Sequence, residues 1–156
     1  MSQPLADIPI RRMAAADIDR IVELAQRVSG APQWPQTAYL RALDSDAAPP
    51  RIALVAEDRG ALAGFAVASL LPPQAELETI VVTAEHQRQG IGAHLLAALV
   101  GKLRPAGVCE LQLEVRALNA HALAFYRRSG FVKTGLRPLY YADPEEDAVL
   151  MGLNLG

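Results

Sequence analysis

The sequence has one cysteine, almost no net charge and no long apolar run. The single cysteine, Cys109, excludes an internal disulfide and any metal site built from several cysteines. Because Cys109 lies in an apolar stretch, we expect a buried, unreactive thiol rather than a catalytic nucleophile. The 15 basic and 17 acidic side chains leave a net charge of −2, which provides no basic field for nucleic acid. Any phosphate-binding site must therefore be local.

No apolar stretch reaches the length of about 20 residues that crosses a bilayer. Segment 1–7 lacks the basic and apolar regions of a signal peptide. We therefore predict a cytoplasmic protein that binds neither membranes nor nucleic acid. The 156 residues, of which 51% are hydrophobic, suffice for a single domain over 1–156 with a sizeable core. We expect a monomer or a weak dimer.

Apolar periodicity and turn signals predict the element order β-α-α-β-β-β-α-β-α-β-β. Strands are predicted over 8–13, 51–57, 61–71, 76–82, 108–115, 131–136 and 148–155, and a loop over 137–147. Helices are predicted over 18–28, 35–43, 92–103 and 120–129, the first capped by Asp17 and the last by Asn119. This order predicts an α/β fold, with a mixed sheet of about seven strands flanked on both faces by about four helices.

A glycine-punctuated turn over 86–93 joins strand 76–82 to the third helix. The first N–H groups of a helix have no partner within it, and its dipole adds about half a positive charge, so the turn can bind an anion. Gly90 and Gly92 would let phosphates approach the backbone, and Arg88 adds a full charge. The alternative is an ordinary strand-to-helix turn in which the glycines serve only geometry.

Two residues that can exchange protons follow the glycine turn. Glu114 lies near the carboxyl end of its strand, on the face opposite the apolar side chains. Asn119, Ala122 and Tyr126 lie on one stripe of the next helix, which can face the same cleft. On the pattern alone, Glu114 also fits an ion pair with Arg116, and Tyr126 also fits a hydrogen-bonded tyrosine at the rim of the core.

These motifs resemble the GCN5-related N-acetyltransferases. The resemblance rests on Gln87-x-x-Gly90-x-Gly92, then Leu113-Glu114-Val115-Arg116, then Asn119-x-x-Ala122-x-x-x-Tyr126-x-x-x-Gly130-Phe131. Segments 31–34, 76–77, 137–141 and 146–148 are more narrowly similar to the ribosomal-protein-alanine N-acetyltransferases. Pro35 and Pro138-Leu139 depart from the family pattern, in segments that would face the substrate.

The resemblance implies acetyl-coenzyme A as the acetyl donor. Its pyrophosphate would bind the backbone of the glycine turn, and its pantetheine arm would pair with strand 76–82, which must then splay from its neighbour. Glu114 would be the general base for the amine, and Tyr126 the general acid for the departing thiolate. We predict no metal, because the histidines lack a metal-ligand spacing. The implied cofactor-binding residues are Ile80, Val81, Val82, Gln87, Arg88, Gln89, Gly90, Ile91, Gly92, Ala93 and Asn119.

The expected acceptor is the α-amine at a protein N-terminus. An α-amine with a pKa near 8 is about a fifth neutral at pH 7.4, whereas a lysine with a pKa near 10.4 is about a thousandth neutral. By resemblance the acceptor is the N-terminal alanine of small-subunit ribosomal protein eighteen, acetylated directly in a ternary complex. The predicted acceptor-binding residues are Trp34, Glu76, Glu78, Tyr140 and Tyr141.

Some alternatives stay open at this point. Glu78 is a second candidate base. The acidic segment 143–147 either attracts a basic peptide or is a solvated charge run. The acceptor could instead be a lysine side chain or a small amine. A regulatory module that binds coenzyme A without turnover is the alternative outside enzymology.

Overall fold

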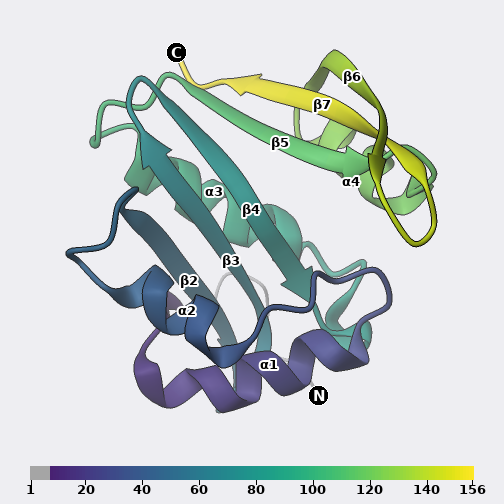
Figure 1. Ribbon diagram of the computed structural model, residues 1–156. Helices are drawn as coiled ribbons and strands as arrows, with labels where there is room; N and C mark the ends of the chain where they lie inside the picture. Colours follow the sequence, from purple (N-terminus) through teal and green to yellow (C-terminus); the bar gives the residue numbers. More distant parts are fainter. Residues whose placement is uncertain (1–7) are drawn as a thin grey trace.

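The computed structural model describes residues 8–156, which form one seven-stranded sheet with helices on both faces (Figure 1). Segment 1–7, on which the signal-peptide argument depends, lies outside the described residues. The elements are β1 (Ile10–Arg12), the 3₁₀ turn η2 (Ala15–Asp17), α1 (Ile18–Arg27), α2 (Gln36–Leu43), β2 (Arg51–Asp58), β3 (Ala61–Leu71), β4 (Gln74–Val82), the 3₁₀ turn η3 (Ala84–His86), α3 (Ile91–Leu103), β5 (Glu110–Arg116), α4 (Ala120–Arg128), β6 (Val132–Tyr141) and β7 (Glu146–Asn154).

The predicted order of strands and helices and the mixed sheet are confirmed. The strands lie in the order β1-β2-β3-β4-β5-β7-β6. Within residues 8–156, β4 and β5 are the one parallel pair, and the other neighbours are antiparallel. The helix α3 connects β4 to β5, as a parallel pair requires. The glycine turn therefore lies at the carboxyl end of β4, where α/β sheets commonly bind ligands.

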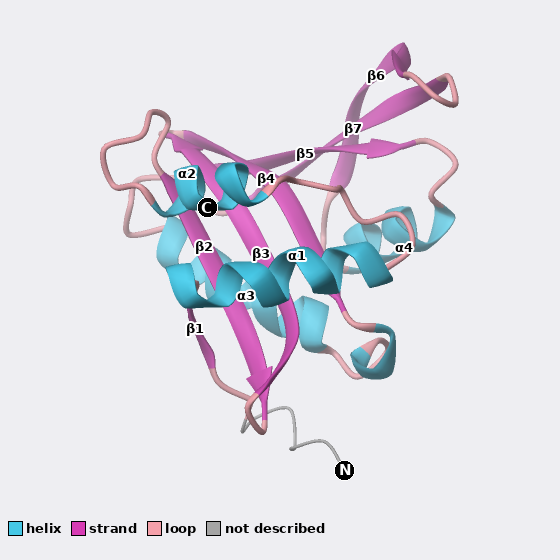
Figure 2. Cartoon of the chain, turned by 60° about the horizontal axis from the view of Figure 1, so that its bottom comes forward, coloured by secondary structure: helices cyan, strands magenta, loops and turns pink. Residues whose placement is uncertain are grey.

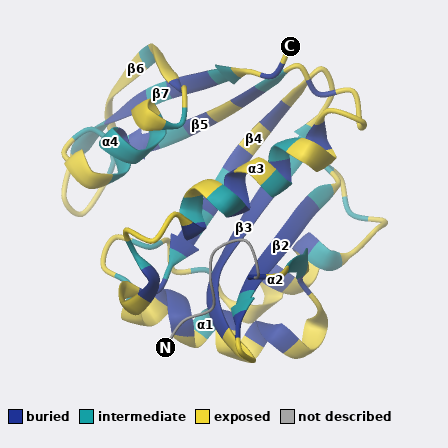
Figure 3. Ribbon diagram, turned by 180° about the vertical axis from the view of Figure 1, so that it is seen from behind, coloured by how far each residue is buried: buried dark blue, intermediate teal, exposed yellow. Residues whose placement is uncertain are grey.

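Two apolar cores lie on opposite faces of the sheet. The helices α1 and α2 cover one face, where Ile21, Tyr39 and Phe65 are fully buried (Figure 2). The helix α3, together with α4, covers the other face, and Leu95 and Leu99 of α3 pack there (Figure 3). The strands β2 and β3 are thus buried on both faces of the sheet.

The hairpin between β2 and β3 turns at Arg59 and Gly60. Both have positive φ angles, 53° and 84°, as a two-residue hairpin turn of type I′ requires. The predicted turn at Asp58-Arg59-Gly60 is therefore confirmed. It places Asp58, the last residue of β2, at one end of the sheet.

The prediction of a loop over 137–147 is wrong. The strand β6 continues to Tyr141 and β7 begins at Glu146, so the connection covers only 142–145. The pairing of the two strands is interrupted between Arg137 and Tyr141. Pro138 has no N–H to donate, and Leu139 has a φ of 50° and donates its N–H to Asp147 Oδ1 instead of the ladder. Segment 137–141 therefore has loop-like residues although it is a bulged part of β6.

Three smaller expectations also change. Asp17 precedes α1 without capping it, because its carboxylate accepts the Ala14 N–H and two Arg11 N–H groups. Cys109 is exposed rather than buried. Asn119, in contrast, caps α4 as predicted, with Oδ1 accepting the Ala122 N–H at 3.1 Å. None of the helices within 8–156 is long and apolar enough to span a membrane.

Candidate functional site

The site is organised by a gap between β4 and β5. The two strands pair at three positions only, which are Gln74 with Glu110, Ala75 with Leu111, and Glu76 with Gln112. Beyond these positions they diverge, as Figure 1 shows. The predicted splaying of the strand is therefore confirmed. Over 77–82, the edge of β4 that faces β5 has no strand partner among the described residues, so its backbone groups can pair with an extended ligand.

The glycine turn lies at the end of this gap. Arg88 and Gly90 both have left-handed backbones, with φ angles of 64° and 85°. The first hydrogen bond of α3 runs from the His94 N–H to the Gly90 carbonyl, so the N–H groups of 91–93 precede the helical pattern. The side chain of Ile91 is buried in the core, so only its backbone can contact a ligand. Successive N–H groups, the helix dipole and the exposed Arg88 side chain together suit an anion.

Two glutamine side chains hold this turn from within. Gln87 Nε2 donates to the Val82 carbonyl at 3.1 Å, and Gln89 Nε2 donates to the Glu85 carbonyl at 3.0 Å. Gly92 has a packing role, because a Cβ there would lie 3.1 Å from the Phe125 ring. The absence of a side chain at Gly92 thus lets α3 approach α4.

The acidic side chains of β4 and β5 gather on the sheet face that α1 and α2 cover. Leu111, Leu113 and Val115 of β5 pack on the other face, so Glu114 points to this one. The pairing of β3 with β4 skips Glu78, which forms a bulge. The acidic side chains Glu76, Glu78 and Glu114 come close enough for their charges to interact at Glu76.

Each of the three carboxylates has a different environment. Glu78 is held by Arg51, with Nε to Oε1 at 2.7 Å. Glu114 forms a looser ion pair with Arg137 at 3.6 Å. Glu76 has no hydrogen-bond or ion-pair partner among residues 8–156, and its pKa is raised by partial desolvation and then by the two neighbouring carboxylates. Glu76 is therefore the least constrained member, and the ion pair of Glu114 is looser than that of Glu78.

Tyr126 lies on the opposite face of the sheet from Glu114. It packs against Phe131 of the core, with 5.5 Å between ring centroids. Burial raises its pKa to about 12, with a smaller contribution from Tyr141. Its hydroxyl group therefore stays protonated throughout the physiological range.

Two tyrosines of β6 adjoin Glu114. A hydrogen bond to Glu114 is the main cause that raises the pKa of Tyr140. Burial, followed by the charge of Glu114, raises the pKa of Tyr141. Arg116 lies over the Tyr141 ring at 4.3 Å and pairs with Glu146 at 3.3 Å. The strand β6 thus brings both predicted acceptor-binding tyrosines to Glu114.

Trp34 lies elsewhere, against Tyr39 in the core under α2, with 5.2 Å between ring centroids. No ring contact joins it to Tyr140 or Tyr141 within the described part of the chain. Its contact with an acceptor stays a prediction.

The acidic segment 143–147 is partly structural. Glu146 accepts the Leu118 N–H at 2.7 Å, and Asp147 accepts the Leu139 N–H at 2.9 Å. These two carboxylates are therefore committed to the β6–β7 hairpin and its surroundings. They are less available to a basic peptide than the charge run suggests.

The structure also reveals residues that the sequence did not single out. Arg51 and Arg137 neutralise part of the acidic face, although they are distant in sequence from the carboxylates that they bind. His86 is buried between Asp58 and Thr83. The contacts of Arg51, Arg137 and Asp58 join segments that are distant in sequence, so they form only when the sheet is assembled, whereas Thr83 and His86 are three residues apart.

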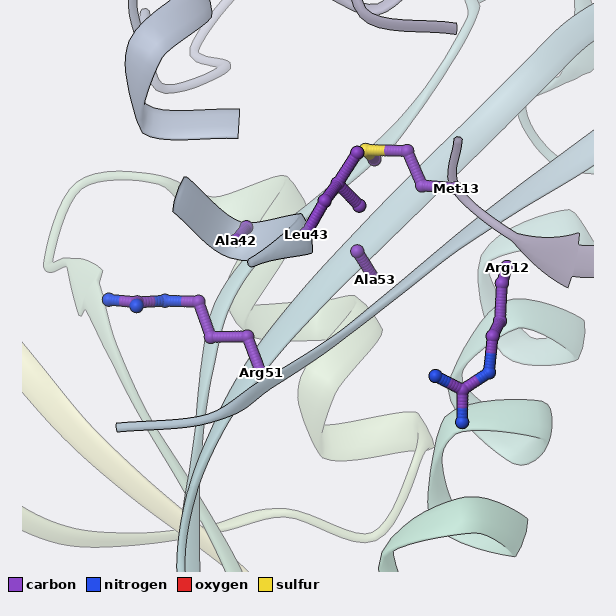
Figure 4. A pocket seen from close by; sticks show the side chains of 6 residues that line it. All are labelled: Arg12, Met13, Ala42, Leu43, Arg51 and Ala53. Atoms are coloured by element: carbon purple, nitrogen blue, oxygen red, sulfur yellow. The ribbon is translucent and has the colours of Figure 1, made fainter. Parts of the chain in front are cut away.

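A hollow of about 200 Å³ lies beside this face, between the end of α2 and the strands β1 and β2 (Figure 4). Two arginines line it, but the Arg51 side chain extends away from Arg12 and binds Glu78. The hollow therefore lacks a convergent anion site. Within residues 8–156, no three His, Cys, Asp or Glu side chains are grouped so that they could hold a metal ion.

Comparison with known proteins agrees with this geometry. Residues 18–131 match the model of the acetyltransferase (GNAT) family. The chain is 43% identical over 96 residues to the [ribosomal protein bS18]-alanine N-acetyltransferase of Escherichia coli, covering 60% of this chain and 65% of that protein. The match thus spans slightly less than two thirds of that relative.

A second relative matches over its whole length. The N-alpha-acetyltransferase RimI of Mycobacterium tuberculosis is 38% identical over 161 residues, which cover 100% of this chain and 98% of that protein. The crystal structure of the E. coli ribosomal-protein-S18-alanine N-acetyltransferase superposes with a TM-score of 0.82 at 31% identity, over 96% of this chain and 94% of that one. Similarity to these proteins therefore extends beyond the core motifs to the complete sheet.

Proposed function

Because the chain belongs to the acetyltransferase (GNAT) family, we propose that it transfers an acetyl group from acetyl-coenzyme A to the N-terminal α-amine of a protein. The observation that carries this proposal is the gap between β4 and β5, with an unpaired strand edge beside Glu114. The names of the relatives support the N-terminal alanine of ribosomal protein bS18 as the acceptor.

The residues around the gap fit the acetyl donor. The N–H groups of 91–93 and the left-handed residues Arg88 and Gly90 would bind its diphosphate. The edge of β4 at 80–82, which has no strand partner on the β5 side, would pair with its amide-containing arm through the groups other than the Val82 carbonyl, which Gln87 binds. Asn119 Nδ2 can donate a hydrogen bond near its reactive end. Acetyl-coenzyme A supplies a thioester, whose carbonyl carbon is open to attack by an uncharged amine.

Glu114 would remove the proton that blocks this attack. A protonated α-amine has no free electron pair, so a carboxylate near the gap must accept its proton directly or through water. Glu114 lies past the point where the strands separate, and its contacts are a loose ion pair with Arg137 and the Tyr140 hydroxyl. Glu76, beside it, would hold the ammonium group before the transfer, because its carboxylate has no other partner among the described residues.

Tyr126 would act on the leaving sulfur from the other face of the sheet. Its hydroxyl is protonated at neutral pH, because its pKa is about 12. The Tyr126 hydroxyl can therefore donate a hydrogen bond to the sulfur. As the carbon–sulfur bond breaks, the hydroxyl proton passes to the sulfur, which leaves as a thiol. In this scheme the amine attacks the thioester directly in a ternary complex, and no acetylated side chain forms as an intermediate.

The test uses two peptides and mass spectrometry. One peptide begins with a free alanine and contains no lysine, and the other has a blocked N-terminus and several lysines. We expect acetylation of the first peptide alone. Acetylation of the second peptide alone would indicate lysine acetylation instead. If neither peptide is acetylated although acetyl-coenzyme A binds, the acceptor is a small amine or the protein is a binding module without turnover.

A variant pair tests the proposed base. Glu114→Gln should lower turnover by about a hundredfold or more, with the affinity for acetyl-coenzyme A unchanged. Gln112→Leu is the matched control, because Gln112 is exposed two residues earlier on the same face of β5. Wild-type turnover in Glu114→Gln would exclude Glu114 as the base.

A further inference from the structure

Three buried polar side chains join the β2–β3 hairpin to the glycine turn. Asp58, Thr83 and His86 each have only 8% of their surface exposed. The His86 ring lies between the other two, with Nε2 2.8 Å from Asp58 Oδ2 and Nδ1 2.6 Å from Thr83 Oγ1. Because an ionised carboxylate only accepts hydrogen bonds, Nε2 carries a proton that it donates to Asp58. In the neutral ring, Nδ1 accepts a hydrogen bond from the Thr83 hydroxyl group.

This cluster connects parts of the chain that are distant in sequence. Asp58 ends β2 at the hairpin turn, 28 residues before His86. His86 ends η3 and is the first residue of the glycine turn, which enters α3. Thr83 fixes the start of the same segment, because its N–H donates to the Ala63 carbonyl of β3 at 2.9 Å. The imidazole therefore fastens the beginning of the glycine turn to the end of the β2–β3 hairpin.

The glycine turn needs such an anchor. Arg88 adopts a left-handed conformation, which costs a non-glycine residue about 1 kcal/mol and persists only where the surroundings impose it. The side chains of Gln87 and Gln89 bond to carbonyls of 82 and 85, within the same segment. The His86 side chain, in contrast, bonds to a residue of another strand. Both ring nitrogens of His86 are hydrogen-bonded, so the ring orientation is fixed. The backbone of the residues that follow His86 is therefore held in place at its first residue.

We propose that His86, held by Asp58 and Thr83, is a positioning residue for the diphosphate of coenzyme A. It keeps the N–H groups of the glycine turn in the arrangement that binds the anion before the ligand arrives, which lowers the ordering cost of binding. His86 itself lies behind the turn and touches no reacting atom. This inference rests on the proposed function, since it assumes that the turn binds the donor.

The test measures binding of coenzyme A by calorimetry, which needs no acceptor. We expect His86→Leu to weaken the affinity by about tenfold, the size of effect that the loss of a buried hydrogen-bonded group produces. Thr83→Val removes the hydroxyl at constant volume and should weaken the affinity for coenzyme A by a smaller factor. Thr83→Ser keeps the hydroxyl and should bind coenzyme A with the affinity of the wild type. His121→Leu is the matched control, because His121 is an exposed histidine on α4.

A second readout separates positioning from general damage. S-acetylpantetheine lacks the diphosphate and the nucleotide, so kcat/KM with this donor should be equal in the wild type and His86→Leu, while kcat/KM with acetyl-coenzyme A falls about tenfold. An equal loss with both donors, or unchanged affinity for coenzyme A in both His86→Leu and Thr83→Val, would overturn the proposal. A wild type that binds coenzyme A but acetylates neither peptide would contradict the proposed acceptor alone.

Discussion

Arg51 holds Glu78 in a two-point ion pair, with Nε to Oε1 at 2.7 Å and Nη2 to Oε2 at 3.5 Å. Both side chains have 19% of their surface exposed, so the pair is largely withdrawn from solvent. A carboxylate held in this way has both oxygens engaged by one guanidinium, so it would have to give up these contacts before it could reach an incoming amine. Glu78 therefore has a structural role on the acidic face, beside the freer Glu76 and Glu114.

Removing the charge of Glu78 should leave the chemical step intact. We expect Glu78→Gln to change kcat by less than about threefold, against the hundredfold loss expected for a general base. The variant should also melt at a lower temperature, because Arg51 loses its charged partner. Steady-state kinetics and thermal unfolding measure the two effects. A fall in kcat as large as that of Glu114→Gln would make Glu78 the base.

The pKa of Tyr126 sets an expectation for the alkaline limb of the pH–rate profile. Since the folded protein raises this pKa to about 12, the hydroxyl keeps its proton to about pH 11. Deprotonation of Tyr126 should therefore cause no decline in kcat between pH 7 and 10. Tyr126→Phe should lower kcat at every pH in that range by a similar factor of about tenfold to a hundredfold. A decline below pH 10 that disappears in Tyr126→Phe would contradict the assignment.

The elements of this fold were predictable where a signal is local. Alternating and helical apolar patterns gave the strands and helices, and asparagine at a helix start gave the Asn119 cap. The motifs around Glu114 and Tyr126 predicted the region of the candidate site. The second half of β6, over 137–141, was predicted as a loop because Pro138 and the left-handed Leu139 are typical of loops.

Contacts between distant segments were not predictable in the same way. Arg51 lies 27 residues before Glu78, and Asp58 lies 28 residues before His86, so neither pair leaves a periodic pattern. The bulge at Glu78 also has no signature in the sequence, although it shifts the side chains that follow to the other face. These features depend on the register of neighbouring strands, which is fixed only in the assembled sheet.

Gly90 and Gly101 provide a matched pair in α3 and its N-cap. Gly90 has a φ of 85°, where an alanine is strained by about 1 kcal/mol, whereas a Cβ at the helical Gly101 meets no atom within 4 Å. Gly90→Ala should therefore weaken the binding of coenzyme A, because the turn shifts to relieve the strain. Gly101→Ala should leave binding unchanged and raise the stability by about 0.5 to 1 kcal/mol. Calorimetry and thermal unfolding test both, and unaltered binding in Gly90→Ala would contradict the diphosphate assignment.

Asp17 should make the stability of the fold sensitive to acid. Its carboxylate is almost fully buried and accepts hydrogen bonds from Arg11 and from the Ala14 N–H, and the bonds to Arg11 are the main cause that lowers its pKa to about 2. Because the folded pKa lies below the ordinary value of 3.8, the unfolded chain binds the proton more readily. The stabilisation is therefore complete above about pH 5 and is lost as the pH falls toward 2.

This shift corresponds to about 2 kcal/mol of unfolding free energy at neutral pH. We expect Asp17→Asn to lose at least this amount at pH 7 and to show a shallower decline in stability between pH 4 and pH 2, measured by urea unfolding at each pH. Asp46→Asn is the control, because Asp46 is exposed in the connection after α2. Parallel pH profiles for Asp17→Asn and the wild type would show that the ion pair with Arg11 contributes nothing to acid sensitivity. Since Arg11 also binds Glu57 of β2, the loss should spread to the β1 edge of the sheet and spare the gap between β4 and β5.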